Sequence, residues 1–181
     1  IQRGRDILGR ESFGLLILMA VMVFGFSVAN PKFLAMPSLS SMGFQAPLLG
    51  VLTLAMLAPM ISGGFNLAII YTANISALAL AWVLLQFGGP EAGIGALILG
   101  SAAALVVGTL AGAVMGVVIA YIGAHPILVS LAMMIFLRGL GEFLTRGGDI
   151  SGFPPSLAVL GHGTLLGVPV PLILFGIVAL I

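Results

Sequence analysis

Polar side chains follow a pair of glycines where two long apolar runs of the chain meet. The residues concerned are Gly63, Gly64, Asn66, Tyr71, Thr72, Asn74 and Ser76. Non-helical backbone at membrane depth must be buried by protein or line a wet cavity, and polar side chains there turn toward a partner or a cavity. We therefore expect these seven residues to line the path of a polar solute.

Each of these residues also has a simpler interpretation. Asn66 opens the apolar run after the glycines, and asparagine is a good helix N-cap. Tyr71 and Asn74 share one helix face, and Thr72 and Ser76 share a neighbouring one. Hydrogen bonds between membrane helices, worth about 0.6 kcal/mol on average, would equally account for these polar groups.

Arg138 and Glu142 form the second group, because they are four residues apart in an apolar stretch. Arg138 lies roughly 18 Å along the helix expected to start at Pro126, beyond the midplane of a bilayer. This spacing predicts an intramembrane ion pair. The alternative is that Arg138 extends to the outer interface and anchors the helix there.

Small residues recur at every fourth position between residues 100 and 124, and Gly108, Gly112 and Gly116 are the centre of this stripe. Small side chains let the backbones of membrane helices approach closely. We therefore predict that these glycines pack against another helix of the same chain.

The sequence offers no catalytic set and no metal site. It has no cysteine, its two histidines are far apart, and Lys32 is its only lysine, so a phosphate-binding lysine loop is absent. We expect a protein that is not an enzyme and binds no cofactor itself. The net charge of +1 also argues against nucleic acid as a partner.

Composition predicts an all-α, polytopic membrane protein, since 61% of the 181 residues are hydrophobic and 6% are charged. We expect about five complete transmembrane helices plus a truncated sixth, with residues 33–42 as an interfacial piece. The apolar runs are residues 13–29, 44–61, 67–86, 93–122 and 126–144, and a final run from about residue 169.

Charge at the N-terminus predicts the orientation. Residues 1–11 hold three arginines, so we expect them on the cytoplasmic side and residues 145–168 in an extracytoplasmic loop. We expect residues 1–181 to form a single transmembrane domain of a longer protein, because the last apolar run is too short for a full crossing.

Several motifs resemble permease subunits of bacterial ABC importers for ribose, xylose and related sugars. The sequence Ile-Ser-Gly-Gly-Phe-Asn-Leu at 61–67 is similar to that family's glycine-pair signature. Further similar segments are residues 125–131, 136–140, 145–152, 161–163 and 167–171. The chain departs from the signature at Asn66, Ala68 and Ile70, where the family has aspartate, serine and glycine.

The resemblance implies that residues 1–181 are the N-terminal half of a longer, type II-like permease in the bacterial inner membrane. This permease would pass a sugar or similar neutral polar solute. The resemblance also implies a second permease subunit, identical or not, two ATP-binding cassette subunits that hold ATP and Mg²⁺, and a periplasmic solute-binding protein. The alternatives are a permease for nucleosides or other small solutes, and an autonomous small channel or membrane scaffold.

Overall fold

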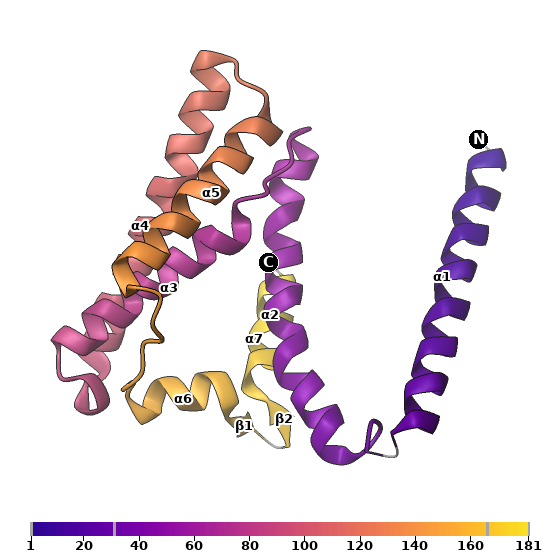
Figure 1. The fold of residues 1–181 in the computed structure, drawn as a ribbon, viewed down its shortest axis with the longest axis horizontal. Helices are drawn as coiled ribbons and strands as arrows, with labels where there is room; N and C mark the ends of the chain where they lie inside the picture. The colour runs from indigo at the N-terminus through magenta and orange to yellow at the C-terminus, as the bar shows by residue number, and fades with distance from the viewer. Residues whose placement is uncertain (1, 31, 166, 181) are drawn as a thin grey trace. The chain divides into compact units, whose positions relative to one another are not determined.

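The computed structural model describes residues 2–30, 32–165 and 167–180, with side chains from Phe13 onward. These residues form seven α-helices, a short 3₁₀ segment and a two-stranded ribbon (Figure 1). The chain divides into two compact units, residues 1–45 and residues 46–181, and each is described by itself.

The first unit is built on α1 (Gln2–Ala29), which ends in a tight turn. The side chain of Asn30 closes this turn, because its Oδ1 accepts a hydrogen bond of 3.0 Å from the Lys32 backbone N–H. Beside the turn, the rings of Phe26 and Phe33 lie 5.7 Å apart. The N-terminal arginines, on which the predicted orientation depends, lie outside the residues whose side chains are described.

The helix α2 (Met36–Ile61) is longer than the sequence suggested. Residues 33–42 were expected to form an interfacial piece, with the second apolar run starting at residue 44. Instead the helix runs through Pro47 and Pro59. Each proline removes one backbone donor and obstructs the carbonyl four residues earlier, which a long apolar helix can tolerate.

Three helices form the packed part of the second unit: α3 (Ile69–Gln86), α4 (Ile94–Ile122) and α5 (Pro126–Thr145). One buried cluster joins all three through Ile75, Ala111 and Leu137. Tyr71 packs against this cluster from the first turn of α3. Because Leu137 is about 17 Å along α5, α3 begins roughly halfway along its neighbour.

The 3₁₀ segment η1 (Gly89–Glu91) links α3 to α4 and lies over a second buried cluster. That cluster contains Leu84, Ala92 and Ala96, and Phe153 and Leu157, from the chain after α5, pack on it. At the other end of α4, Gly123 adopts a left-handed φ of 73° and ends the helix. Pro126 then starts α5 at a position where its missing N–H costs nothing.

The stretch at residues 145–168 was predicted to be a loop and is partly ordered. It contains α6 (Pro155–His162), followed by β1 (Thr164–Leu165) paired antiparallel with β2 (Val168–Pro169). Pro155 sits at the first position of α6, where proline favours helix formation. The short helix α7 (Val170–Ala179) follows the ribbon.

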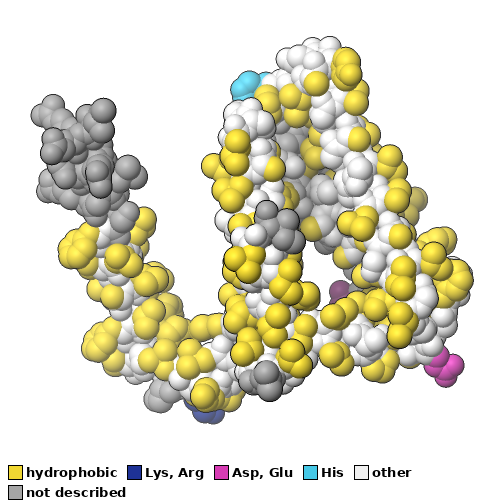
Figure 2. Space-filling model, turned by 180° about the vertical axis from the view of Figure 1, so that it is seen from behind, with side chains coloured by type: hydrophobic (Ala, Val, Ile, Leu, Met, Phe, Trp, Pro, Cys, Tyr) yellow, Lys and Arg dark blue, Asp and Glu magenta, His cyan; other side chains and the backbone are white. Residues whose placement is uncertain are grey.

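The prediction of an all-helical membrane protein is confirmed, apart from this ribbon. Four helices, α2 to α5, are long and apolar enough to cross a bilayer, whereas the described apolar parts of α1 and α7 are shorter. Figure 2 shows hydrophobic side chains spread along the helices, with few charged side chains among them. Large apolar side chains such as Leu105, which is 73% exposed, give the helices a surface that suits lipid rather than water.

Candidate functional site

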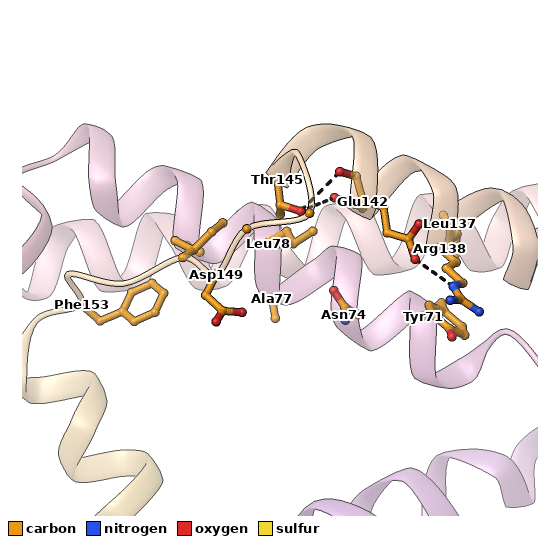
Figure 3. A pocket seen from close by; sticks show the side chains of 15 residues that line it. Tyr71, Asn74, Ala77, Leu78, Leu137, Arg138, Glu142, Thr145, Asp149 and Phe153 are labelled. Atoms are coloured by element: carbon orange, nitrogen blue, oxygen red, sulfur yellow. Dashed lines mark hydrogen bonds and ion pairs between the residues drawn. The ribbon is translucent and has the colours of Figure 1, made fainter.

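A cavity of about 650 Å³ opens between α3 and α5 (Figure 3). It contains polar groups from three separate elements. From α3 come Tyr71 and Asn74, from α5 come Arg138, Glu142 and Thr145, and from the loop after α5 comes Asp149. Leu78, Leu137 and Phe153 supply apolar walls. A polar solute would find both hydrogen-bonding groups and an apolar surface in this cavity.

The charged pair in this cavity is held by helix geometry. Arg138 Nε lies 2.9 Å from Glu142 Oε1, the pairing expected from their i,i+4 spacing. The side chains are 62% and 63% exposed, so solvent screens the pair and it contributes little to stability. Figure 3 shows the Tyr71 ring next to the Arg138 side chain. Both charged groups therefore remain open toward the cavity.

The end of α5 directs the next loop over the cavity. Arg146 has a φ of 53°, and Gly147 donates a 3.0 Å hydrogen bond to the Glu142 carbonyl. The same turn carries a bond from Arg146 N–H to the Phe143 carbonyl, so α5 ends in a Schellman motif. This reversal brings Asp149 to the cavity, where Figure 3 shows it on the loop side.

A second cavity of about 390 Å³ lies beside the glycine pair. Its walls are residues 62–66 on one side, Gly112, Met115 and Gly116 of α4 on another, and Pro126 and Ser130 at the start of α5. Gly63 has a φ of 79°, and Gly64 N–H donates to the Pro59 carbonyl at 2.8 Å. Together with the hydrogen bond from Gly63 N–H to the Met60 carbonyl, this bond ends α2 in a second Schellman motif.

Asn66 shapes the chain in front of α3 but is not its N-cap. That position belongs to Ala68, which has no side-chain cap hydrogen bond. Asn66 Oδ1 instead accepts from the Ala68 backbone N–H at 2.9 Å, forming an Asx turn two residues upstream. The predicted capping role is therefore corrected to that of a turn residue, because the helix begins later than the sequence suggested.

The seven residues predicted to line one path are distributed over different places. Tyr71 and Asn74 line the α3–α5 cavity, whereas Gly63, Gly64 and Asn66 line the second cavity. Ser76 faces α4 near Gly108 in a third hollow. The Thr72 hydroxyl is buried and has no hydrogen-bond partner among the described residues. The seven residues are separated because α3 begins about halfway along α5. The first turns of α3 therefore lie away from Gly63 and Gly64.

The glycine stripe of α4 contacts its neighbour at one end only. A Cβ at Gly100 would lie 2.6 Å from a Leu80 methyl, and one at Gly108 would lie 2.9 Å from the Ser76 hydroxyl. At Gly112 and Gly116 nothing described lies within 4 Å. A strict four-residue repeat turns by about 40° per step on a helix of 3.6 residues per turn, so the stripe leaves the α3 contact.

Several residues that line these cavities were not predicted, among them Asp149 and Ser130. Asp149 was taken only as a loop residue, although its position three residues after a left-handed helix end could have suggested a returning loop. Ser130 lies eight residues before Arg138 and therefore on the same face of α5. This spacing was the one sequence signal for its role in the site. Ser130 is 2% exposed and contacts the backbone of Phe65. Within the described part of the chain no group of three His, Cys, Asp or Glu side chains could hold a metal.

Comparison with known proteins places the chain beside transport proteins. The autoinducer 2 import system permease protein LsrD of Enterobacter sp. is 30% identical over 171 residues, which cover 91% of this chain and 50% of the relative. The protein of that name from Photorhabdus laumondii is 29% identical over 175 residues, covering 93% and 50%. The one from Klebsiella pneumoniae is 30% identical over 171 residues, covering 91% and 49%.

These relatives confirm the resemblance to importer permeases that the motifs indicated. The chain spans about half the length of the relatives it matches. No family model matches it, and no solved structure matches it.

Proposed function

We propose that this homologue of import-system permeases forms part of the translocation path of an ATP-driven ABC importer. The observation that carries the proposal is the cavity between α3 and α5, with polar groups from three elements in an otherwise apolar helical chain. Polar and ionisable groups are costly in a bilayer and typically mark a solute path. The relatives supply the direction of transport, since their names describe import.

The chemistry of the cavity favours a small neutral polar solute, such as a sugar or autoinducer 2. Arg138 is paired with Glu142, so the carboxylate of Asp149 leaves the cavity with a net negative charge. That charge disfavours anionic solutes. Asn74 can both donate and accept hydrogen bonds, and a carboxylate accepts bonds from hydroxyl groups. Such bonds are individually weak and exchangeable, as passage requires.

The energy source and the partners belong to the same proposal. The chain has no phosphate-binding lysine loop, so ATP and Mg²⁺ would be held by two ATP-binding cassette subunits. A second permease subunit and a periplasmic solute-binding protein would complete the importer in the bacterial inner membrane. With residues 1–11 in the cytoplasm, the α3–α5 cavity would open toward the outside and the second cavity toward the inside.

Single cysteines in the complete transporter test the path, because the chain has no native cysteine. A cysteine at Asn74 should react with a water-soluble thiol reagent and be protected by transported solute. A cysteine at Ile70, which lines neither cavity, is the control for protection. If Asn74→Cys is unreactive with and without solute, or is unaffected by solute during turnover, the cavity is not on the path.

Charge in the cavity gives an independent test. Replacing Asp149 by Asn should raise the KM for transport while assembly with the ATPase is retained, because a hydrogen-bond acceptor for solute is weakened. Glu91 in η1 is an exposed carboxylate outside the cavity, so Glu91→Gln is the matched control. An equal effect of both replacements would mean that surface charge, and not the cavity, sets the KM.

A further inference from the structure

The segment between α2 and α3, residues 62–68, is tied to α5 by the hydroxyl of Ser130. Ser130 Oγ lies 3.1 Å from the carbonyl oxygen of Phe65, a residue 65 positions away in the sequence. The serine is 2% exposed, so its hydroxyl is almost completely shielded from water. Among the described residues, this is the side-chain hydrogen bond that connects residues 62–68 to α5.

The same hydroxyl has a second acceptor at the same distance. Ser130 Oγ also lies 3.1 Å from the carbonyl oxygen of Ile127, one turn earlier in α5. A serine hydroxyl carries a single hydrogen and can donate to one acceptor at a time. When the hydrogen points to Ile127, the donor stays satisfied within α5 and the Phe65 carbonyl loses its partner. Release of the segment therefore leaves no buried donor unpaired.

The space needed for movement is present next to the bond. Phe65 and Ser130 both line the second cavity, whose α4 wall is formed around Gly112 and Gly116. No described atom lies within 4 Å of a Cβ built at either glycine, and the same holds for Gly63 in the segment. A shift of the segment around Gly63 would enter open space, whereas Ala68 at the end of the segment stays packed in the core.

We propose that Ser130 is a positioning residue, a two-acceptor latch that holds residues 62–68 against α5 and releases them when its hydrogen turns to Ile127. In the buried cluster, Leu137 lines the α3–α5 cavity and Ala111 precedes Gly112, which lines the second cavity. Joining the two cavities therefore requires α3 to move away from α5. The latch fixes the segment that leads into α3. Its role in transport rests on the proposed function, whereas the latch itself is measurable without transport.

The test measures how often the segment opens, using Leu67→Cys as the reporter in the complete transporter without ATP. Leu67 is half-buried in the segment, so its thiol reacts when the segment leaves α5. Loss of one net hydrogen bond changes an equilibrium by about fivefold. Ser130→Ala should therefore raise the rate of Leu67→Cys modification about fivefold, and Ser130→Thr, which keeps a hydroxyl, should return it toward the starting rate.

Two controls separate the latch from general loosening. Thr53→Ala removes a hydroxyl that bonds only to its own helix, at the Leu49 carbonyl, and should leave the Leu67→Cys rate unchanged. Ile61→Cys, at a position 86% exposed at the end of α2, should react equally fast in every background. If Ser130→Ala does not accumulate, Ser130→Thr and Ser130→Val give the same comparison, since they differ only in the hydroxyl.

An unchanged Leu67→Cys rate in Ser130→Ala, or equal rates in the Thr and Val variants, would overturn the latch. Because this measurement uses no turnover, it can fail while solute still protects Asn74→Cys. If the Leu67→Cys rates change as expected but solute never protects Asn74→Cys, the latch is supported and the proposed path is refuted.

Discussion

Replacing single glycines of α4 by alanine provides a sharp test of how α3 and α4 pack. Gly100 and Gly112 are both helical, both belong to the four-residue repeat, and have opposite surroundings. A Cβ at Gly100 would lie 2.6 Å from a Leu80 methyl and 3.3 Å from the Leu80 carbonyl oxygen, whereas one at Gly112 meets nothing described within 4 Å. The Leu80 side chain can rotate away, but its backbone carbonyl cannot.

The expected sizes follow from two opposing terms. An extra methyl group in a packed contact costs about 1–3 kcal/mol, and alanine gains about 1 kcal/mol over glycine in a helix. We therefore expect Gly100→Ala to lower the free energy of unfolding by about 1 kcal/mol net. Gly112→Ala should leave it unchanged or raise it by up to about 1 kcal/mol.

The assay is the thermal unfolding midpoint of the 181-residue chain in detergent, followed by loss of the monodisperse peak. For a chain of this size about 1 kcal/mol corresponds to roughly 2–4 °C. Gly100→Ala should unfold below the parent and Gly112→Ala at or above it. If Gly112→Ala is the more destabilised variant, the helix faces are assigned incorrectly, and the stripe packs as the sequence alone suggested.

Three further predictions concern single contacts, and each is measured in the same thermal assay. Reversing both Arg138 and Glu142 should recover part of the stability lost by each single reversal, because the i,i+4 pair is restored with its charges exchanged. A double variant no better than the worse single one would contradict the pairing. Arg146→Gly should stabilise the chain by about 1 kcal/mol, because a left-handed φ of 53° costs a non-glycine residue about that much. A lower unfolding midpoint would show that the arginine side chain makes a contact worth more than this backbone strain. Asn66→Ala should lower the free energy of unfolding by about 1 kcal/mol, whereas Asn66→Asp keeps an acceptor for the Ala68 N–H and should lower it little. Equal losses in both variants would assign the effect to the NH₂ group of the Asn66 side chain.

The sequence was sufficient for the features that depend on neighbours along the chain. Apolar runs interrupted by glycine and proline located α3, α4 and α5, and Pro126 marked the first residue of α5. The i,i+4 spacing of Arg138 and Glu142 was enough to predict their pairing, because the helix alone determines it.

Features that depend on the relative depth of two helices could not be predicted in this way. Nothing in the local pattern shows that Tyr71 lies level with Leu137, so one expected path became two cavities. The contact of Ser130 with Phe65 spans 65 positions and involves a backbone acceptor, which has no sequence signature. The glycine repeat was read as a straight face, although a period of four turns slowly around a helix.

The start of α3 halfway along α5 has an electrical consequence. A helix N-terminus carries about half a positive charge, and no side chain caps α3. If α5 spans the bilayer, this partial charge lies deep in the hydrocarbon layer, where the low dielectric constant strengthens its field. Inward-moving sodium ions or protons would be repelled there, while an uncharged solute would not. The non-helical segment before α3, proposed to make room for a polar solute, would thus also limit leakage of ions across the membrane.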